Sequence, residues 1–289
     1  MPQEFLVKGM LALRLDDGAV RTVTLLRDAS GGTTFANVVR QSAPNDHFAR
    51  KSLGGAHIED FVVNVATPSS SGLVQWIAAS GGPKTSTRSG AVLTCAADST
   101  IVAEQAFGGA LISETTMPAL DGSTKEPAAL SVRFVAATTL PTISPGGKLK
   151  LPVGGAVLKP WLPSLFRLEI AGLDCTKVSR IDGFTVRRDF NSPIDFPDLR
   201  IFVSMASAQA WIEWHKRMVI DGRGGDKEEK KGTIRLLGTD LKTELARIEL
   251  AGLGIYRLKP ERPVPDAAPE RLVADLYCEQ MTLIASGAG

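Results

Sequence analysis

The stretch AWIEWHKRMVIDGRGGDKEEKKGTIRLL, from Ala210 to Leu237, decides how the rest of the chain is interpreted. Its first part carries tryptophans and apolar residues at helical spacing and stops at Gly224 and Gly225, which predicts a short helix. A block of charge from Asp226 to Lys231 follows, and then a run with the composition of a strand. The stretch holds no set of catalytic residue types, so it predicts a structural unit.

A less charged form of this unit occurs earlier in the chain. HIEDFVVNVATPSSSGLVQWIAASGG (57–82) and DLRIFVSMASAQAWIEWHKRMVIDGRGG (198–225) share one order of features. Each has an alternating strand, a Ser/Ala-rich entry, a tryptophan-bearing helix and a Gly-Gly stop. The expected helix caps are Ser69, Ser70 or Ser71 in the first copy and Ser204 or Ser207 in the second.

The match continues through two further segments. SGAVLTCAADSTIVAEQAFGGALIS from Ser89 parallels KGTIRLLGTDLKTELARIELAGLGIY from Lys231, each as a strand, a polar turn, a second strand and a glycine-containing bend. EPAALSVRFVAATTL (126–140) parallels ERLVADLYCEQMTLI (270–284). Gly90 and Gly232 are 142 positions apart, and so are Leu130 and Leu272. A constant offset across several elements predicts a tandem duplication.

The first copy carries extra residues near its start. LALRLDDG near Leu11 resembles LFRLEIAG from Leu165 at an offset of about 154, so roughly 12 more residues lie in the first copy. We expect this insert to be a loop within SGGTTFANVVRQSAPNDHFARKS (30–52).

The repeat divides the chain into two domains and a linker. We expect a divergent first domain over 1–140, a Pro/Gly-rich linker over 141–163 and a second domain over 164–289. KLKLPVGGAVLK in the linker could lie along a neighbouring surface or add a strand to a sheet edge. Each copy reads β-β, a loop, then β-α-β-β-β, which predicts an antiparallel sheet or small barrel packed by one helix. The fold class is therefore α+β, mainly β.

Large aromatic residues are expected to fill the space between helix and sheet. Trp211 and Trp214 are three positions apart and share one helix face. An inter-subunit contact is the alternative role for the tryptophans. The predicted core residues are Trp76, Trp211, Trp214, Phe61 and Phe202.

Composition excludes several other classes of protein. The net charge of +2 argues against a dedicated nucleic-acid binder. No apolar run approaches the length of a membrane span, and the first residues make a poor signal peptide. Three distant cysteines and three histidines show no metal-ligand spacing, so no metal or cofactor is expected. The cysteines indicate small buried residues in a reducing compartment.

The second copy resembles the contractile phage tail tube family. LFRLEIAGLDCTKVSRIDGFTVRRDF (165–190) is similar to the family's F-x-V-x-I-x-G strand and the strand that follows it. The segment 199–258 resembles the family's apolar strand, LWDWI-type helix, charged turn and two later strands. ERLVADLYCEQMTLI resembles its final strand, although Glu279 is the only acid in the CEQMTLI ending, where the family has an acidic ETLELAHEG. The family usually has one such domain per chain, so two fused copies look more like baseplate hub proteins or a double-domain tube subunit.

The resemblance implies a structural, non-enzymatic protein that assembles into rings. The inner wall of each ring would be a closed sheet, which removes unpaired strand edges. Three two-domain chains would replace six single domains. The implied partners are other copies of the chain and the sheath, baseplate, spike or tape-measure proteins, with DNA or an effector only as passing cargo and no membrane insertion. Assembly is expected in the cytoplasm, before incorporation into a virion or injection particle.

Two other hypotheses remain open. One is a monomeric adaptor or effector carrier that reuses the tube fold. The other is an enzyme with paired carboxylates drawn from Glu104, Glu114, Asp121 and Glu126.

Charge is concentrated in the second copy. Residues up to Pro145 hold 11 Lys/Arg and 12 Asp/Glu, whereas the remainder holds 22 and 19. The charged block is either a solvated turn or a contact between subunits, where charge pairs set register. Arg187 and Arg188 near a strand end are further candidates, either as assembly contacts or as part of a basic lumen. The candidate assembly contacts are Asp226, Lys227, Glu228, Glu229, Lys230, Lys231, Arg187 and Arg188.

Overall fold

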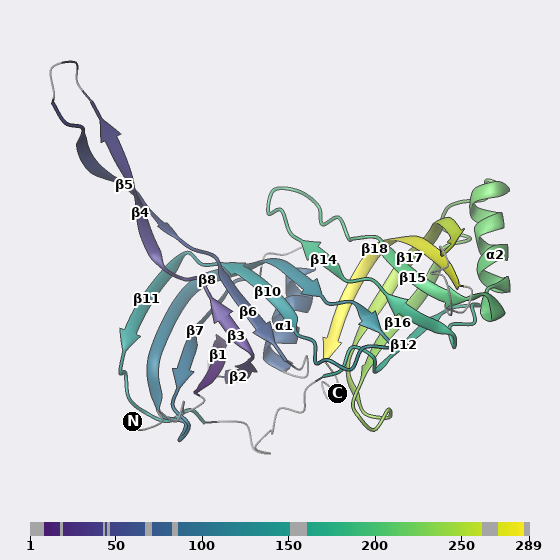
Figure 1. Ribbon diagram of the computed structural model, residues 1–289, viewed down its shortest axis with the longest axis horizontal. Coiled ribbons are helices and arrows are strands. Elements are labelled where there is room, and N and C mark those ends of the chain that lie inside the picture. Colours follow the sequence, from purple (N-terminus) through teal and green to yellow (C-terminus); the bar gives the residue numbers. More distant parts are fainter. Residues whose placement is uncertain are drawn as a thin grey trace, which may run out of the picture.

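The computed structural model describes residues 9–17, 20–42, 44, 47–66, 71–82, 86–150, 161–261 and 271–285. In this part of the chain the backbone is mostly antiparallel strand, with two α-helices, α1 (Ser71–Ser80) and α2 (Gln209–His215) (Figure 1). A 3₁₀ turn, η1 (Met205–Ser207), precedes α2, and a π-helical turn, η2 (Lys216–Ile220), follows it. The predicted α+β, mainly β class is confirmed.

The first sheet is built from the N-terminal half of the chain together with one strand, β14, from the C-terminal half. Its strands follow the order β2-β1-β7-β8-β10-β6-β3, and β11 and β14 also pair with β8. In chain order the strands are β1 (Met10–Asp17), β2 (Val20–Leu26), β3 (Asp28–Ser30), β6 (Phe61–Val65), β7 (Arg88–Cys95), β8 (Ile101–Met117), β10 (Leu130–Val135), β11 (Thr138–Ile143) and β14 (Phe184–Arg187). In β6 every second side chain is buried, as its alternation predicts.

The second sheet follows the order β12-β16-β17-β18-β15-β13-β9. Its strands are β9 (Leu120–Asp121), β12 (Phe166–Ile170), β13 (Val178–Ile181), β15 (Leu199–Ser204), β16 (Lys230–Leu237), β17 (Glu244–Pro260) and β18 (Arg271–Ala285). Six strands in a row take equivalent places in the two sheets: β1, β7, β8, β10, β6 and β3 match β12, β16, β17, β18, β15 and β13.

The irregularities of the two sheets also coincide. The β7–β8 ladder shifts register between Arg88 and Gly90, and the β16–β17 ladder shifts between Lys230 and Gly232, 142 positions later. The expected glycine bends lie at Gly109 in β8 and Gly252 in β17, each inside a continuous 17-residue strand. Both glycines have positive φ, 60° and 62° respectively. β-Bulges bend a strand at a defined place, so both copies curve at equivalent points.

The insert in the first copy is a β-hairpin, so the prediction of a loop within residues 30–52 was wrong. β4 (Thr34–Gln41) and β5 (Arg50–Ile58) pair only with each other and project from the body (Figure 1). Nearly every residue in both strands is exposed. The segment therefore lacks the alternating burial that makes a strand recognisable from sequence.

Both ends of the expected linker pack on the first sheet. β11 pairs with β8 and crosses the expected boundary at residue 140. Leu149 is buried, and its amide donates to the Ser99 carbonyl. Trp161 is 1% exposed, and its carbonyl accepts from the Ala128 amide. Most of the KLKLPVGGAVLK segment lies outside the described residues.

Four of the five expected core aromatics are buried: Trp76, Trp211, Trp214 and Phe61. Phe202 is a correction, because it is half-buried and points away from the core. Its neighbours in β15, Ile201 and Val203, are fully buried, so the alternation of the strand turns Phe202 to the opposite face. There the guanidinium of Arg180 lies 5.3 Å from its ring centroid.

The two α-helices differ in which sheets they contact. α2 packs on β17 of its own copy, whereas α1 contacts β2 and β8 of the first sheet and also β18 of the second. Ser204 caps the turn η1 by accepting from the Ala206 amide. The expected capping of the tryptophan-bearing helix by Ser204 or Ser207 was wrong, because α2 begins after Ala208 and has no side-chain cap. The three serines expected to cap the first helix lie outside the residues whose side chains are described.

Candidate assembly surfaces

The two copies are joined by an exchange of strands. β14 belongs to the second copy by sequence but pairs with the far end of β8, with Phe184 opposite Met117 and Arg187 opposite Glu114. In return, β9 of the first copy pairs with β13 of the second sheet. We call this pairing of β14 with β8 and of β9 with β13 the internal junction. A strand edge in the N-terminal half of the chain thus accepts a strand from the C-terminal half.

Polar side chains reinforce the internal junction on one face. The Arg187 Nε donates to the Glu114 carboxylate at 2.9 Å, and the hydroxyls of Thr116 and Thr185 lie 2.9 Å apart. These cross-strand pairs are partly exposed, and each is worth about 0.2–1 kcal/mol. They therefore fix the register of the strands more than they hold the copies together.

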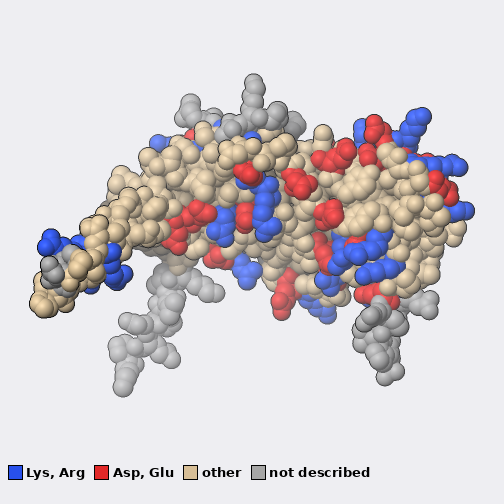
Figure 2. Space-filling model, turned by 90° about the horizontal axis from the view of Figure 1, so that it is seen from above, with Lys and Arg blue, Asp and Glu red and all other residues tan. Residues whose placement is uncertain are grey.

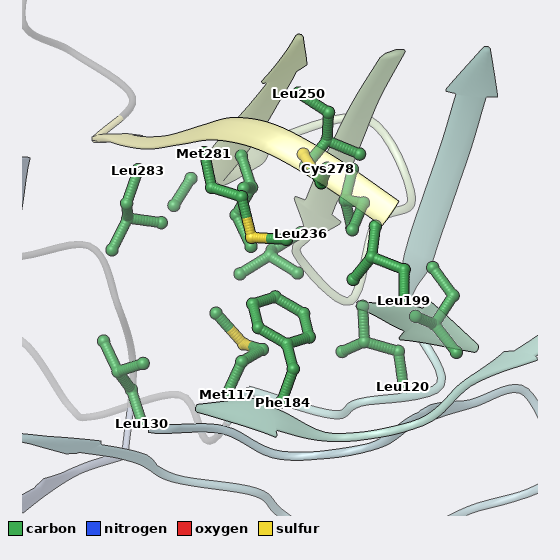
Figure 3. Close-up of a cluster of buried hydrophobic side chains, with 14 of the residues drawn as sticks. Met117, Leu120, Leu130, Phe184, Leu199, Leu236, Leu250, Cys278, Met281 and Leu283 are labelled. Carbon is green, nitrogen blue, oxygen red and sulfur yellow. The ribbon is translucent and has the colours of Figure 1, made fainter. Parts of the chain in front are cut away.

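Apolar packing supplies most of the cohesion between the copies. Met117, Leu120 and Phe184 project from the internal junction toward Leu199, Met281 and Leu283 of the second sheet (Figure 3). One buried cluster includes side chains of both sheets, so the two copies share a hydrophobic core. A small cavity of about 70 Å³ remains beside this seam, lined mainly by apolar side chains that include Ile77 of α1 and Phe196.

Arg187 and Arg188 both act within the internal junction. Arg187 pairs with Glu114, and the Arg188 side chain donates to the Ser80 carbonyl at the end of α1. The Arg188 backbone amide also donates to the Ser113 carbonyl at 2.8 Å, which extends the β14–β8 ladder by one residue. The two arginines therefore contact the other copy of the same chain.

The charged block divides into two groups. Asp226, Lys227 and Lys231 are exposed, as expected for a solvated turn or a surface contact. Glu228, Glu229 and Lys230 are half-buried and contact other parts of the second copy. The sequence could not separate these groups, because a run of charge has no period that indicates which members turn inward.

Each half-buried member of the block has a defined contact. Glu228 pairs with Arg217 at 3.0 Å, and Glu229 accepts from the Tyr277 hydroxyl at 2.7 Å. Burial and this bond to Glu229 raise the pKa of Tyr277 to about 12. The Lys230 ammonium lies 5.5 Å from the Trp214 ring, where burial lowers the pKa of Lys230. These three contacts connect the charged block to η2, to β18 and to α2.

A buried carboxylate on the outer face of the second sheet was missed by sequence analysis. Asp275 is 2% exposed and accepts from Arg200 at 2.7 Å and from Arg257. Burial disfavours the charged form of Asp275, but the two arginines outweigh this and hold its pKa below the usual value. An acid at an alternating position of the strand LVADLYC was the available signal.

The β4–β5 hairpin exposes several large apolar side chains. Phe35, Val38 and Leu53 are 48%, 48% and 75% exposed. Basic side chains from Arg40, Arg50 and Lys51 gather toward its end, which is blue at the lower left of Figure 2. An isolated two-stranded ribbon is marginally stable in water, so this hairpin has the character of a segment that meets a partner.

The carboxylates considered for an enzyme do not form a pair in the structure. Glu104 pairs with Arg14 at 2.7 Å, Glu114 with Arg187, and Asp121 accepts from the Ser123 hydroxyl at 2.6 Å. Glu126 is exposed. Among the described residues no group of three His, Cys, Asp or Glu side chains could hold a metal ion. No helix in the same part of the chain has the length and apolar content to cross a bilayer.

No family model and no curated protein matches the chain. Among solved structures, a chain of the anti-feeding prophage baseplate is 9% identical, with a TM-score of 0.42, over 50% of this chain and 99% of that chain. A chain of the PVC sheath–tube complex, an extracellular contractile injection system, is 12% identical over 49% and 94%, with a TM-score of 0.39. A chain of the anti-feeding prophage tube-terminating cap is 13% identical over 48% and 89%, with a TM-score of 0.39.

Proposed function

We propose that this chain is a structural, self-assembling component of a phage tail or a phage-tail-like contractile injection apparatus. It consists of two tandem tube-type domains and builds or terminates the inner tube. Its function is to form rings, in which three two-domain chains take the places of six single domains. The partners are further copies of the chain, with sheath, baseplate, spike or tape-measure proteins at the ring faces.

The internal junction is the observation that carries this proposal. Inside one chain, two sheets of the same strand order are already linked by exchanged strands, because β14 pairs with β8 and β9 pairs with β13. A contact between equivalent units that uses different surfaces on each unit is heterologous, and repeating it closes a ring when the rotation permits. The chain thus contains one contact of the proposed ring.

The location of charge supports different neighbours for the two copies. The matching turn of the first copy is the Ser/Thr/Gly-rich GGPKTSTRSG, whereas the second copy carries Asp226, Lys227 and Lys231 at its surface. Exposed charges set the register and the orientation of a contact. Fusion of two copies lets each present its own loops to sheath, spike or the next ring.

Negative-stain electron microscopy of the purified chain, together with its mass in solution, tests the proposal. Rings or tubes with three chains in each layer are expected. A charge reversal of Asp226, Lys227 and Lys231 should weaken stacking or partner binding at unchanged stability, because these side chains are solvated. A uniform monomer at every concentration would favour the alternative of a monomeric adaptor that reuses the fold.

A further inference from the structure

We infer that the ring closes by a specific strand addition: the segment Thr33–Phe35 of one chain pairs antiparallel with the edge of Arg257–Lys259 in the next chain. This inference rests on the proposed function, because it concerns contacts between copies of the chain. It repeats between chains the pairing that β14 makes with β8 inside one chain.

The internal junction has a defined place on β8. Residues Arg88 to Cys95 of β7 cover one edge of β8 as far as Ala110. Beyond that point β14 takes over the same role, pairing from Glu114 to Met117. The partner on one edge of β8 thus changes from a strand of its own copy to a strand of the other copy.

The equivalent part of β17 has no such partner among the described strands. β16 covers one edge of β17 only as far as Leu253, and β18 pairs with the opposite edge through to Pro260. Tyr256 is 41% exposed, and Lys259 is also exposed. An open strand end with unpaired backbone groups is a template for another strand.

The alignment of β17 with β8 follows from matched irregularities. Gly109 and Gly252, both at positive φ, are 143 positions apart. The ladder with β10 skips Ser113, and the ladder with β18 skips Tyr256, again 143 positions later. Thr116, which faces Thr185 in the internal junction, therefore corresponds to Lys259.

The same comparison of ladder positions identifies the segment of the first copy that corresponds to β14. Ala29 of β3 lies opposite Val63, and Ile181 of β13 lies opposite Ile201. Val63 and Ile201 in turn lie opposite Val132 and Ala274, which are 142 positions apart. Ala29 thus corresponds to Ile181.

Counting forward from this match aligns the segments that follow. Gly31 corresponds to Gly183, and Thr33 corresponds to Thr185. β14 follows β13 directly, as β4 follows β3, and Thr33 is exposed. The segment Thr33–Phe35 therefore corresponds to Thr185–Arg187 of β14, and from Thr34 on it pairs on one edge with β5.

The two surfaces are placed for a contact between chains. β4 and β17 lie on opposite sides of the elongated molecule (Figure 1). One chain therefore offers the incoming strand at one end and the open edge at the other. In the transferred register Thr33 faces Lys259 and Phe35 faces Arg257, which places an aromatic ring beside a guanidinium.

Disulfide trapping tests this register. Chains carrying Thr33→Cys are mixed with chains carrying Lys259→Cys, oxidised in air and separated on a non-reducing gel. When equal amounts are mixed into three-chain rings, about half of the chain is expected to move from the monomer band to a covalent dimer, which reductant reverses and which neither variant gives alone. The double variant in one chain is expected to give a covalent trimer.

Two matched controls define the outcome. The double variant Thr116→Cys/Thr185→Cys should form a disulfide within one chain and stay in the monomer band, because these two side chains face each other in the internal junction. Phe35→Cys mixed with Lys259→Cys is two residues out of register on the same face, and should cross-link poorly. Burial raises the pKa of both Cys175 and Cys278 to about 11 and also raises that of Cys95, so the native thiols react slowly.

The possible failures are distinguishable. Rings in the microscope without the Thr33–Lys259 cross-link would overturn the inferred strand addition and leave the proposed function standing. Preferential cross-linking of the Phe35 pair would overturn the register. A chain that stays monomeric and uncross-linked would contradict both the inference and the proposed ring.

Discussion

Replacement of Trp214 by alanine should strongly destabilise the second domain. The indole is fully buried in the described structure, and its Nε1 donates to the Glu228 carbonyl at 2.9 Å. Trp211 lies edge-on at a centroid distance of 6.4 Å, and the Lys230 ammonium covers the ring. The indole thus joins the helix, the charged turn and the start of β16.

The expected loss is the sum of two effects. Truncating a buried tryptophan to alanine costs about 3–5 kcal/mol through lost transfer free energy and the cavity left behind. The hydrogen bond adds at most about 1 kcal/mol, because the half-buried Glu228 can be hydrated once the indole is gone. Trp214→Phe keeps most of the apolar volume and loses the hydrogen bond, so it should cost about 1–2 kcal/mol.

Urea denaturation followed by far-ultraviolet circular dichroism provides the measurement. With a slope of about 3 kcal/mol per molar urea, Trp214→Ala should lower the midpoint by about 1 M or more. Ile212→Ala is a matched control on the same helix, because Ile212 is 39% exposed. If Trp214→Ala moves the midpoint no further than Ile212→Ala does, the indole is not the packing centre of this domain.

Three further predictions address the second sheet and the core. Because its pKa is lowered, ionised Asp275 stabilises the fold above about pH 4, and this effect is lost as pH falls through the folded-state pKa. Asp275→Asn should therefore lower the free energy of unfolding by about 1.5–3 kcal/mol at pH 7. Denaturation measured across pH should show that the difference from wild type narrows in acid. Gly252→Ala should cost about 1–2 kcal/mol in the same assay, because φ is 62° and a Cβ would stand 2.5 Å from the Glu279 side chain; an unchanged midpoint would mean that the bend is not required. Phe61→Ala should cost about 3–5 kcal/mol and Phe202→Ala about 1 kcal/mol, and equal losses would place Phe202 in the core after all.

Much of the local structure was predictable because burial leaves a period in the sequence. Phe61, Val63 and Val65 alternate with less buried residues, and the strand follows from that alternation. The burial of Trp76, Trp211 and Trp214 followed from their position on short helices, whereas that of Trp161, in the expected linker, was not predicted. Equal offsets between Gly90 and Gly232 and between Leu130 and Leu272 are enough by themselves to predict two similar units.

Where buried residues do not recur at a regular spacing, the prediction from sequence was wrong or could not be made. The exposed β4–β5 hairpin was taken as a loop because neither of its faces is consistently buried. Phe202 was placed in the core because its hydrophobicity outweighed its place in the alternation. The inward members of the charged block were likewise not separable from the solvated ones.

The sequence alone determined the class of fold and the burial of four large aromatic side chains, since these depend on local periodicity. It also predicted a repeated unit from the offset between similar segments. Only the tertiary structure decided which strands are neighbours. Nothing in the residues 184–187 shows that this strand pairs with Glu114–Met117, or that no described strand pairs with β16's edge of β17 beyond Leu253. Strand pairing joins backbone groups that every residue except proline carries alike, so the choice of partner depends on which edges the folded chain brings together.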